Sequence, residues 1–250
     1  MILSRLTDPH WSFLFIDPIP ANIISATRNR LPHTLTTARD ARRHEVIILD
    51  TTPTPTSSSS SSSSDPENKD AKDQKNEKVI AYARWTLPPS LAQQQPEGTV
   101  WVSGQVPSPS ESEKQKYKEA YDAASDAKGR VPGMKDTGLL EFRSAPLERA
   151  EEKILSVDGV VKGEEVLTLE YLTTHPKYWH LGAASMLVKS GTDVADKYGL
   201  KTYVMSEPAG LKVYLNHGFK VVEEVAVDYA RFGGTEETVH YFLVREAVPL

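Results

Sequence analysis

The sequence predicts a mixed α/β fold, three-layered, with helices flanking one central sheet. Three observations lead to this prediction. Strand-like and helix-like segments alternate through residues 166–219, a pair of strand-like segments precedes them, and another pair follows. Such alternation is typical of domains whose helices cover the faces of a single sheet. We therefore expect one domain over residues 1–250, organised around a core at residues 166–219.

The core stretch opens with a strand and a tight turn. Val166–Thr174 is rich in β-branched and aliphatic residues, and Pro176 stops it because proline donates no hydrogen bond to a ladder. The small-residue turn of residues 179–184 then leads into a helix. The first N–H groups of a helix lack partners and lie at the positive end of its dipole, so they suit an anion such as a pyrophosphate.

The helix predicted for residues 184–198 has one apolar face, and Gly199 is placed to end it. Its apolar residues recur at i, i+3, i+4 and i+7, which indicates one buried face: Ala184, Leu187, Val188, Gly191, Val194, Ala195 and Tyr198. A second strand follows at Lys201–Ser206, then a short helix at Pro208–Asn216 and a turn into Phe219.

This stretch resembles the GNAT superfamily of acetyl-CoA-dependent N-acetyltransferases. The family's signatures are Gln/Arg-x-x-Gly-x-Gly/Ala after a strand, and a Tyr four residues before Gly-Phe. The residues at the matching positions are Pro176, Gly182, Ala184, Asp196, Tyr214, Gly218 and Phe219. Trp179 departs from the pattern, because it stands where Gln or Arg is usual. The resemblance covers the C-terminal part of the chain well and the rest weakly.

The resemblance implies a mostly antiparallel mixed sheet with a V-shaped splay between its two central strands, and acetyl-CoA as co-substrate. By match, Leu172, Thr173 and Thr174 supply the free strand edge that holds the pantetheine and the acyl carbonyl. The pyrophosphate would be held by residues of the turn and the helix start: Lys177, Trp179, His180, Leu181, Gly182, Ala183 and Ala184.

The resemblance also implies a catalytic acid and base. Tyr214 would protonate or orient the leaving thiolate; the alternative is an aromatic ring that packs the core. Glu170 lies in the central strand and could take the proton of the amine; the alternative is an outward-facing charge on an alternating strand. Asp228, His240 and Tyr241 are weaker candidates for the base.

The resemblance favours a small-molecule amine as the acetyl acceptor, in a monomer or homodimer. Two alternatives stay open. One is acetylation of a protein lysine or N-terminus. The other is an interaction module that binds CoA without catalysis. Release of free CoA in the presence of amines would distinguish an enzyme from such a module.

Composition and charge narrow the class of protein. The net charge of −5 and the pI near 5.8 argue against a general nucleic-acid binder. No apolar run approaches the ~20 residues of a membrane span, and we expect no secretory signal in the first residues. The chain has no cysteine, which favours a reducing, cytoplasmic location. We expect no metal, because no His, Asp and Glu residues show metal-ligand spacing.

Upstream of the core, residues 45–49 and 79–86 are expected to pair as a hairpin. The intervening residues 51–78 hold a serine tract and a charged mixture, so we expect a disordered loop, either phosphorylatable or neutral. Residues 88–133 form a partly helical insertion, in which Ser110 and Glu113 predict a capping box for a helix at 111–128. Helical structure is also expected at residues 19–31, with Pro20 in the first turn.

Further helical structure is expected at residues 134–155, broken near Pro146. The last two strands are predicted at residues 220–229 and 239–245. Five aromatic residues upstream of the central strand are candidates for acceptor contact, although each is also a candidate for the core: Trp85, Trp101, Tyr117, Tyr121 and Phe142.

Overall fold

A computed structural model describes residues 14–50, 77–93, 100–135, 138–161, 165–233 and 237–249. Most of the expected serine-rich loop, residues 51–76, lies outside the described residues, as do residues 1–13. The last two residues of that stretch, Glu77 and Lys78, form the start of a strand.

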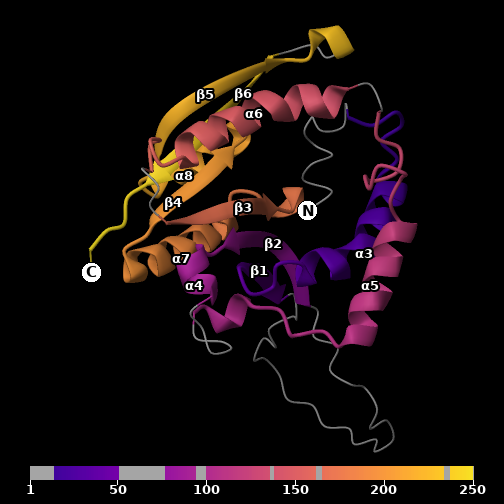
Figure 1. Cartoon of the computed structure of the whole chain (residues 1–250), viewed down its shortest axis with the longest axis horizontal. Coiled ribbons are helices and arrows are strands. Elements are labelled where there is room, and N and C mark those ends of the chain that lie inside the picture. The colour runs from indigo at the N-terminus through magenta and orange to yellow at the C-terminus, as the bar shows by residue number, and fades with distance from the viewer. Residues whose placement is uncertain are drawn as a thin grey trace, which may run out of the picture.

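A six-stranded sheet in the order β1-β2-β3-β4-β6-β5 forms the centre of the molecule (Figure 1). Its strands are β1 Arg42–Asp50, β2 Glu77–Thr86, β3 Val166–Thr174, β4 Lys201–Ser206, β5 Lys220–Asp228 and β6 Glu237–Arg245. β3 and β4 are parallel, and every other neighbouring pair is antiparallel. The predicted mixed, mostly antiparallel sheet is confirmed.

The two central strands separate halfway along β3. Pairing of β3 with β4 ends at Leu169, which lies opposite Val204. At the same point β3 contains a bulge on its other side: Leu169 pairs with Trp85 and Tyr171 pairs with Arg84, so Glu170 has no partner on β2. A bulge adds a residue and bends its strand. β3 therefore diverges from β4, as Figure 1 shows, in the V-shaped splay that the resemblance implies.

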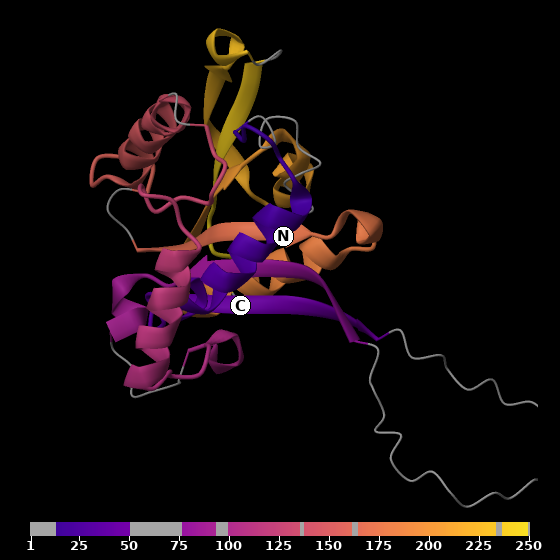
Figure 2. The same cartoon turned by 90° about the vertical axis from the view of Figure 1, so that its right-hand side faces the viewer.

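The helices cover both faces of the sheet. α7 (Ala183–Tyr198) packs on β1, β2 and β3, and α8 (Pro208–Asn216) packs on β4 and β6. α6 (Leu139–Leu155) packs on β5, on the opposite face. α3 (Pro20–Thr36) and α5 (Glu111–Ala123) lie side by side in both views (Figure 1 and Figure 2). The short helices are α4 Pro89–Gln93, η1 Val102–Gly104, η2 Pro176–Tyr178 and η3 Ala230–Phe232.

α7 begins one residue earlier than expected and ends at Gly199, whose φ of 66° is left-handed. Leu187, Val188, Gly191 and Ala195 are buried as predicted, while Tyr198 is exposed. A Cβ on Gly191 would lie 2.1 Å from the Trp85 ring, so this glycine lets the helix approach β2 closely. Trp85 is fully buried there, which makes it a core residue and not an acceptor contact.

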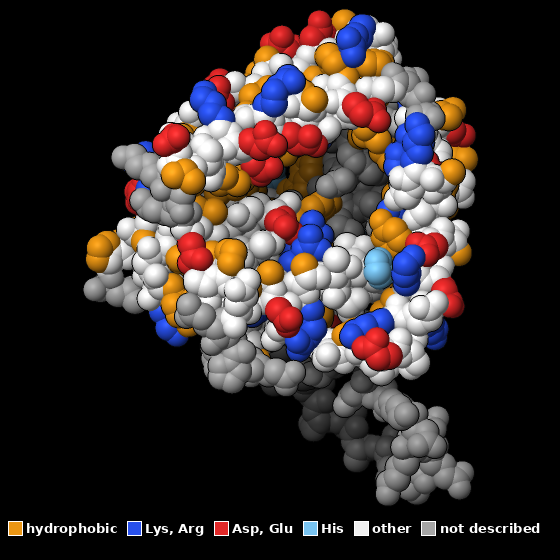
Figure 3. Space-filling view, in the orientation of Figure 1, with side chains coloured by type: hydrophobic (Ala, Val, Ile, Leu, Met, Phe, Trp, Pro, Cys, Tyr) orange, Lys and Arg blue, Asp and Glu red, His pale blue; other side chains and the backbone are white. Residues whose placement is uncertain are grey.

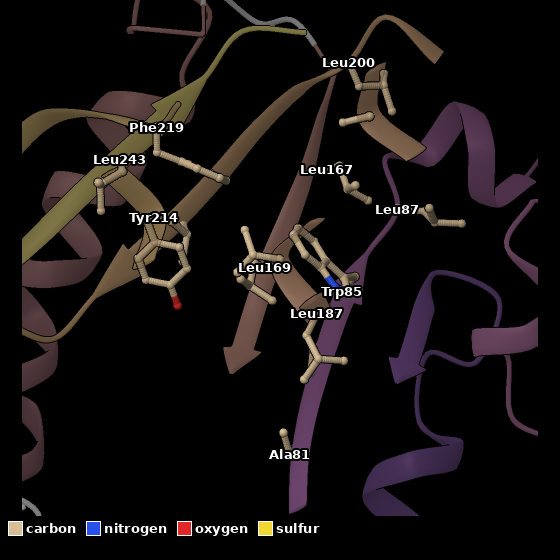
Figure 4. Packing of buried hydrophobic residues seen from close by; sticks show 14 of the residues in the cluster. Ala81, Trp85, Leu87, Leu167, Leu169, Leu187, Leu200, Tyr214, Phe219 and Leu243 are labelled. Atoms are coloured by element: carbon tan, nitrogen blue, oxygen red, sulfur yellow. The ribbon is translucent and has the colours of Figure 1, made fainter. Parts of the chain in front are cut away.

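Two apolar clusters fill the two faces. The first lies under α7 and α8 and includes Trp85, Leu167, Leu187, Tyr214 and Leu243 (Figure 4). Its buried strand residues come from β2, β3, β4 and β6, and partly buried residues of β1 and β5 pack against them. The second lies under α6 and draws its sheet residues from β3, β4, β5 and β6 only. The first cluster therefore crosses the splay, and the second stops beside it.

Two of the upstream helices end at other residues than predicted. α5 has the predicted capping box at Ser110 and Glu113 but ends at Ala123. There the carboxylate of Asp126 accepts from the N–H groups of Lys128 and Arg130, which offers the backbone an alternative to the helix. α3 continues five residues beyond the predicted end.

The predicted break of α6 near Pro146 is wrong, because the helix runs through it. Proline removes one backbone hydrogen bond. Leu139, Leu147 and Ile154 stay buried on one side of the helix, on both sides of the proline along the chain. Their packing on the sheet outweighs the lost bond. No helix in the described part of the chain is long and apolar enough to cross a membrane.

Candidate acetyl-CoA site

The free edge of β3 is set by the hydrogen-bond alternation of an antiparallel pair. The N–H of His175 donates to the carbonyl of Ile80 at 2.7 Å. Since bonded and non-bonded residues alternate along such a ladder, Thr173 directs its backbone groups to β2. Leu172 and Thr174 direct theirs to the opposite side, where β4 has diverged. Of the three predicted edge residues, Leu172 and Thr174 therefore offer backbone groups to the splay, and Thr173 does not.

Trp179 closes the turn that follows this edge. Its indole N–H donates to the carbonyl of Thr174 at 3.0 Å, and the side chain remains 46% exposed. Within the same turn, Nδ1 of His175 accepts from the N–H of Lys177 at 3.2 Å. The residue that departs from the family pattern thus ties the turn to β3. That leaves Leu172 as the edge residue with both backbone groups directed to the splay.

The turn then presents N–H groups at the start of α7. His180 and Gly182 are both left-handed, with φ of 64° and 80°. Gly182 is the N-cap, no side chain caps it, and the first turn of α7 holds no acidic residue. Successive N–H groups in such a turn form a concave anion site. The structure brings His180, Leu181, Gly182, Ala183 and Ala184 together there, with Lys177 exposed nearby.

Tyr214 lies in α8, which packs on β4 and β6 on the same face of the sheet as α7. Its ring packs edge-on against Phe219, with centroids 5.7 Å apart, and the residue is 5% exposed. Its hydroxyl points away from Phe219 (Figure 4). Burial raises the pKa of this phenol well above its usual range. The group therefore stays protonated at neutral pH and is able to donate.

Glu170, the residue of the bulge, lies on the face opposite α7. Its Oε2 is 2.7 Å from Nε of Arg84 and 3.2 Å from Nε of Arg42, and its side chain is 25% exposed. No partner for its Oε1 is found among the described residues. Glu170 is therefore neither a free carboxylate nor a simple outward charge, because two arginines hold it beside the splay.

The surroundings of these arginines are aromatic and half-buried. Nδ1 of His44 lies 2.8 Å from the hydroxyl of Tyr82, and the rings of Tyr82 and Tyr171 are 5.9 Å apart. Burial, aided by Arg84 and Arg42, lowers the pKa of His44 to about 4. Burial also raises the pKa of Tyr82 to about 12. Both groups are therefore uncharged at neutral pH.

A second charged group, which no local sequence pattern indicates, lies across the splay. Glu207 follows β4 directly, and it contacts Nη2 of Arg143 at 2.8 Å and Nδ1 of His240 at 3.2 Å. Burial alone would raise the pKa of Glu207, but His240 and Arg143 outweigh it and lower that pKa. Its partners come from α6 and β6, so only the tertiary fold brings the three residues together.

The weaker candidates for the base have other positions. His240 is 1% exposed, and Glu207 is the one charged partner found for it among the described residues. Asp228 accepts from the N–H of Ala230 at 2.8 Å, and Tyr241 packs against the cluster under α7 and α8. In the described part of the chain, no group of His, Asp and Glu is arranged to hold a metal ion.

Comparison with known proteins gives a partial likeness. No family model and no curated protein matches. Among solved structures, a GNAT-family acetyltransferase from Streptococcus pneumoniae is 17% identical, with a TM-score of 0.28 over 33% of this chain and 50% of that one. An IAA acetyltransferase from Bacillus cereus is 18% identical, with a TM-score of 0.27 over 32% and 61%. The structure of the NatC complex bound to a Gag peptide and CoA is 18% identical, with a TM-score of 0.29, over 34% of this chain and 53% of that one.

The chain spans about half the length of the structures it matches. The likeness covers about a third of this chain. The sequence motifs of residues 166–219 and the strand order of the sheet are similar to those of a GNAT-type acetyltransferase fold.

Proposed function

We propose that the protein transfers an acetyl group from acetyl-CoA to the amine of a small molecule. The observation that carries the proposal is the continuity of two features. The free edge of β3 runs directly into the turn whose N–H groups open α7. An extended amide chain pairs with a strand edge, and a pyrophosphate suits a helix start. One molecule of acetyl-CoA contains both groups in that order.

The chemistry follows from the groups beside the splay. The N–H of Leu172 is directed to where the acyl carbonyl would lie, and a fixed donor there stabilises the charge that develops on its oxygen. The amine loses its proton to Oε1 of Glu170, directly or through water. It attacks the carbonyl carbon, the C–S bond breaks, and Tyr214 protonates the departing thiolate. A phenol that stays protonated at neutral pH suits this last step.

The proposal of a small-molecule acceptor rests on the charged residues near the splay. Two groups of charged residues line the face opposite α7, one beside β3 and one at the end of β4. Half-buried charges of both signs suit a small polar amine. Acetylation of a protein lysine or N-terminus is the alternative, and an assay with peptides alongside small amines separates the two.

The cofactor site is tested at Gly182. A Cβ there would meet nothing within 4 Å, but φ is +80°, so the replacement must tolerate a left-handed backbone. Asp and Asn both tolerate it better than most residues. Gly182→Asp adds a negative charge where the pyrophosphate would lie, whereas Gly182→Asn adds nearly the same volume without charge. We expect the acetyl-CoA affinity of the Asp variant to fall at least ~tenfold, about 1.4 kcal/mol.

Calorimetry with acetyl-CoA measures this difference, and melting temperature controls for folding. Equal affinities of the two variants would overturn the pyrophosphate assignment. Turnover separates an enzyme from a binding module: release of free CoA with a library of amines supports the transferase. Tight binding of acetyl-CoA without release would support the module instead.

A further inference from the structure

We infer that the acetyl acceptor carries an anionic group, a carboxylate or a phosphate, which Arg84 and Arg42 bind on the face of the sheet opposite α7. The inference rests on the proposed function, because it assigns the acceptor of that same site. The charge of the arginine cluster, its free donors and its position beside the splay support it.

The cluster carries a surplus positive charge. Arg42 and Arg84 are 22% and 21% exposed, and both contact the same oxygen of Glu170. His44 and Tyr82 are neutral at neutral pH, for the reasons given above. Among the residues that the structure describes, two positive charges therefore face one negative charge in a half-buried site. A partly desolvated charge without a full partner is costly, and a bound anion would remove that cost.

The cluster also has free donors. Nε of each arginine lies within ion-pair distance of Oε2 of Glu170, and Nη1 of Arg42 donates to the carbonyl of Thr37 at 3.3 Å. Among the described residues, Nη1 and Nη2 of Arg84 have no acceptor. These two nitrogens form one side of a planar fork, which matches two oxygens of a carboxylate or a phosphate. Arg84 is therefore the main ligand and Arg42 the supporting charge.

The position links this anion site to the acetyl site. Arg84 lies opposite Tyr171, and the next residue along β3 is Leu172, which faces the splay. An anion on Arg84 would thus lie beside the reacting carbonyl but on the face away from α7. It is separate from the pyrophosphate site, which opens at the start of α7. Figure 3 shows an acidic and a basic side chain next to each other near the centre of this face, at the edge of the hollow.

The experiment compares matched amines in the full-length protein. One pair is an amino acid and its carboxamide; the other is 2-aminoethyl phosphate and 2-aminoethanol. For each compound we would measure kcat/KM for acetyl transfer, and also direct binding by calorimetry without acetyl-CoA. We expect wild type to prefer the anionic member of at least one pair by about tenfold or more, the scale of one charge-assisted hydrogen bond. The pair that shows the preference distinguishes carboxylate from phosphate.

Two variants locate the anion. Arg84→Gln should abolish the preference, measured as the ratio of kcat/KM between the anionic and the neutral member of each pair, because both members share any change that the variant causes at Glu170. Arg39→Gln is the matched control, because Arg39 is also 21% exposed and lines a separate cavity of about 1060 Å³ near the end of α3. It should keep the preference. Glu170→Gln should strengthen direct binding of the anion, because the competing carboxylate is gone.

Three outcomes would overturn the inference or the proposed function. Loss of preference in Arg39→Gln would overturn the inference in favour of that other cavity. No preference in wild type, with acetyl transfer intact, would overturn the inference and leave the proposed function standing. Anion binding that depends on Arg84, without acetyl-CoA binding, would keep the anion site and overturn the transferase.

Discussion

The two faces of the sheet differ most where β3 and β4 separate. On the α7 and α8 side, one apolar cluster passes from β1 to β6 without interruption. On the α6 side, the apolar cluster ends at β3, and Arg42, Arg84 and Glu170 occupy the sheet beyond it. The first face holds the two halves of the sheet together across the splay. The second is therefore free to carry charges that a purely structural core would exclude.

The largest effect is expected on the packed face, at Tyr214. Tyr214→Phe keeps the ring and removes only the proton donor, so turnover should fall ~10²–10⁴-fold, the usual loss for a general acid. Affinity for acetyl-CoA and melting temperature should stay near those of wild type. Because burial raises the pKa of this phenol, the wild-type rate should show no alkaline limb near its usual ~10. A rate within about threefold of wild type, far short of the general-acid range, would make Tyr214 a packing residue only.

The next largest effect is expected on the free energy of unfolding. It concerns two carboxylates that form ion pairs with arginines, one on each face of the sheet. Asp196 of α7 accepts from Arg245 at 2.7 and 2.8 Å and is 12% exposed, whereas Glu207 is 38% exposed. Asp196→Asn should lower the free energy of unfolding at pH 7 by about 3 kcal/mol, because it leaves a buried arginine unpaired. Glu207→Gln should cost about 1 kcal/mol or less, because solvent screens that pair. Equal losses would remove the contrast between the faces.

The pH dependence of Asp196 follows from its hydrogen bonds with Arg245, which lower its pKa in the folded protein. Its contribution to stability is complete above the pKa of an unfolded aspartate, about 3.9. The contribution disappears as the pH falls through the lower pKa of the folded protein. The stability difference between wild type and Asp196→Asn should therefore shrink over that acidic range, as denaturant titrations at several pH values would measure.

Packing density is tested at Gly191. A helical Gly→Ala change usually stabilises by ~0.5–1 kcal/mol. At Gly191 the sign should reverse, with a loss of about 1–3 kcal/mol, because the new methyl overlaps the buried Trp85 ring. Gly210→Ala in α8 is a graded comparison, since its Cβ would lie 2.9 Å from the Ser206 hydroxyl and 3.2 Å from the Tyr214 ring, so its overlap is milder and its loss should be smaller. A Gly191→Ala protein that melts at or above the wild-type temperature would show that this face packs more loosely than described.

The smallest effect is expected far from both clusters, at the β1–β2 hairpin. Asp50 and Glu77 are paired across the two strands, so a short Gly-Ser turn suffices to join them. Deleting residues 52–76 should leave melting temperature and turnover nearly unchanged, because their composition predicts few packing contacts. A loss of several degrees, which corresponds to roughly 1 kcal/mol, would contradict that reading.

Local patterns in the sequence predict the core of the fold closely. β3, β4 and α8 have their predicted bounds, and α7 differs by one residue, because strand and helix periods and the capping glycine are all local signals. The bulge at Glu170 was not predicted, since strict alternation assumes no extra residue. Arg84, Arg42, Arg143 and Glu207 were not predicted as site residues, because their partners lie far away in the chain.

The short seam between β3 and β4 has a mechanical consequence. Within the described part of the chain, the strand pairing that joins the two halves is confined to residues 166–169 and 201–204, and parallel pairing is slightly weaker than antiparallel pairing. We expect the two halves of the sheet to move as rigid bodies about that joint. The apolar cluster under α7 and α8 limits this motion on one face. A bound chain that forms hydrogen bonds along Leu172 would hold the two halves of the sheet at a fixed separation. Slower amide exchange at Leu172 would then report ligand arrival before any product forms.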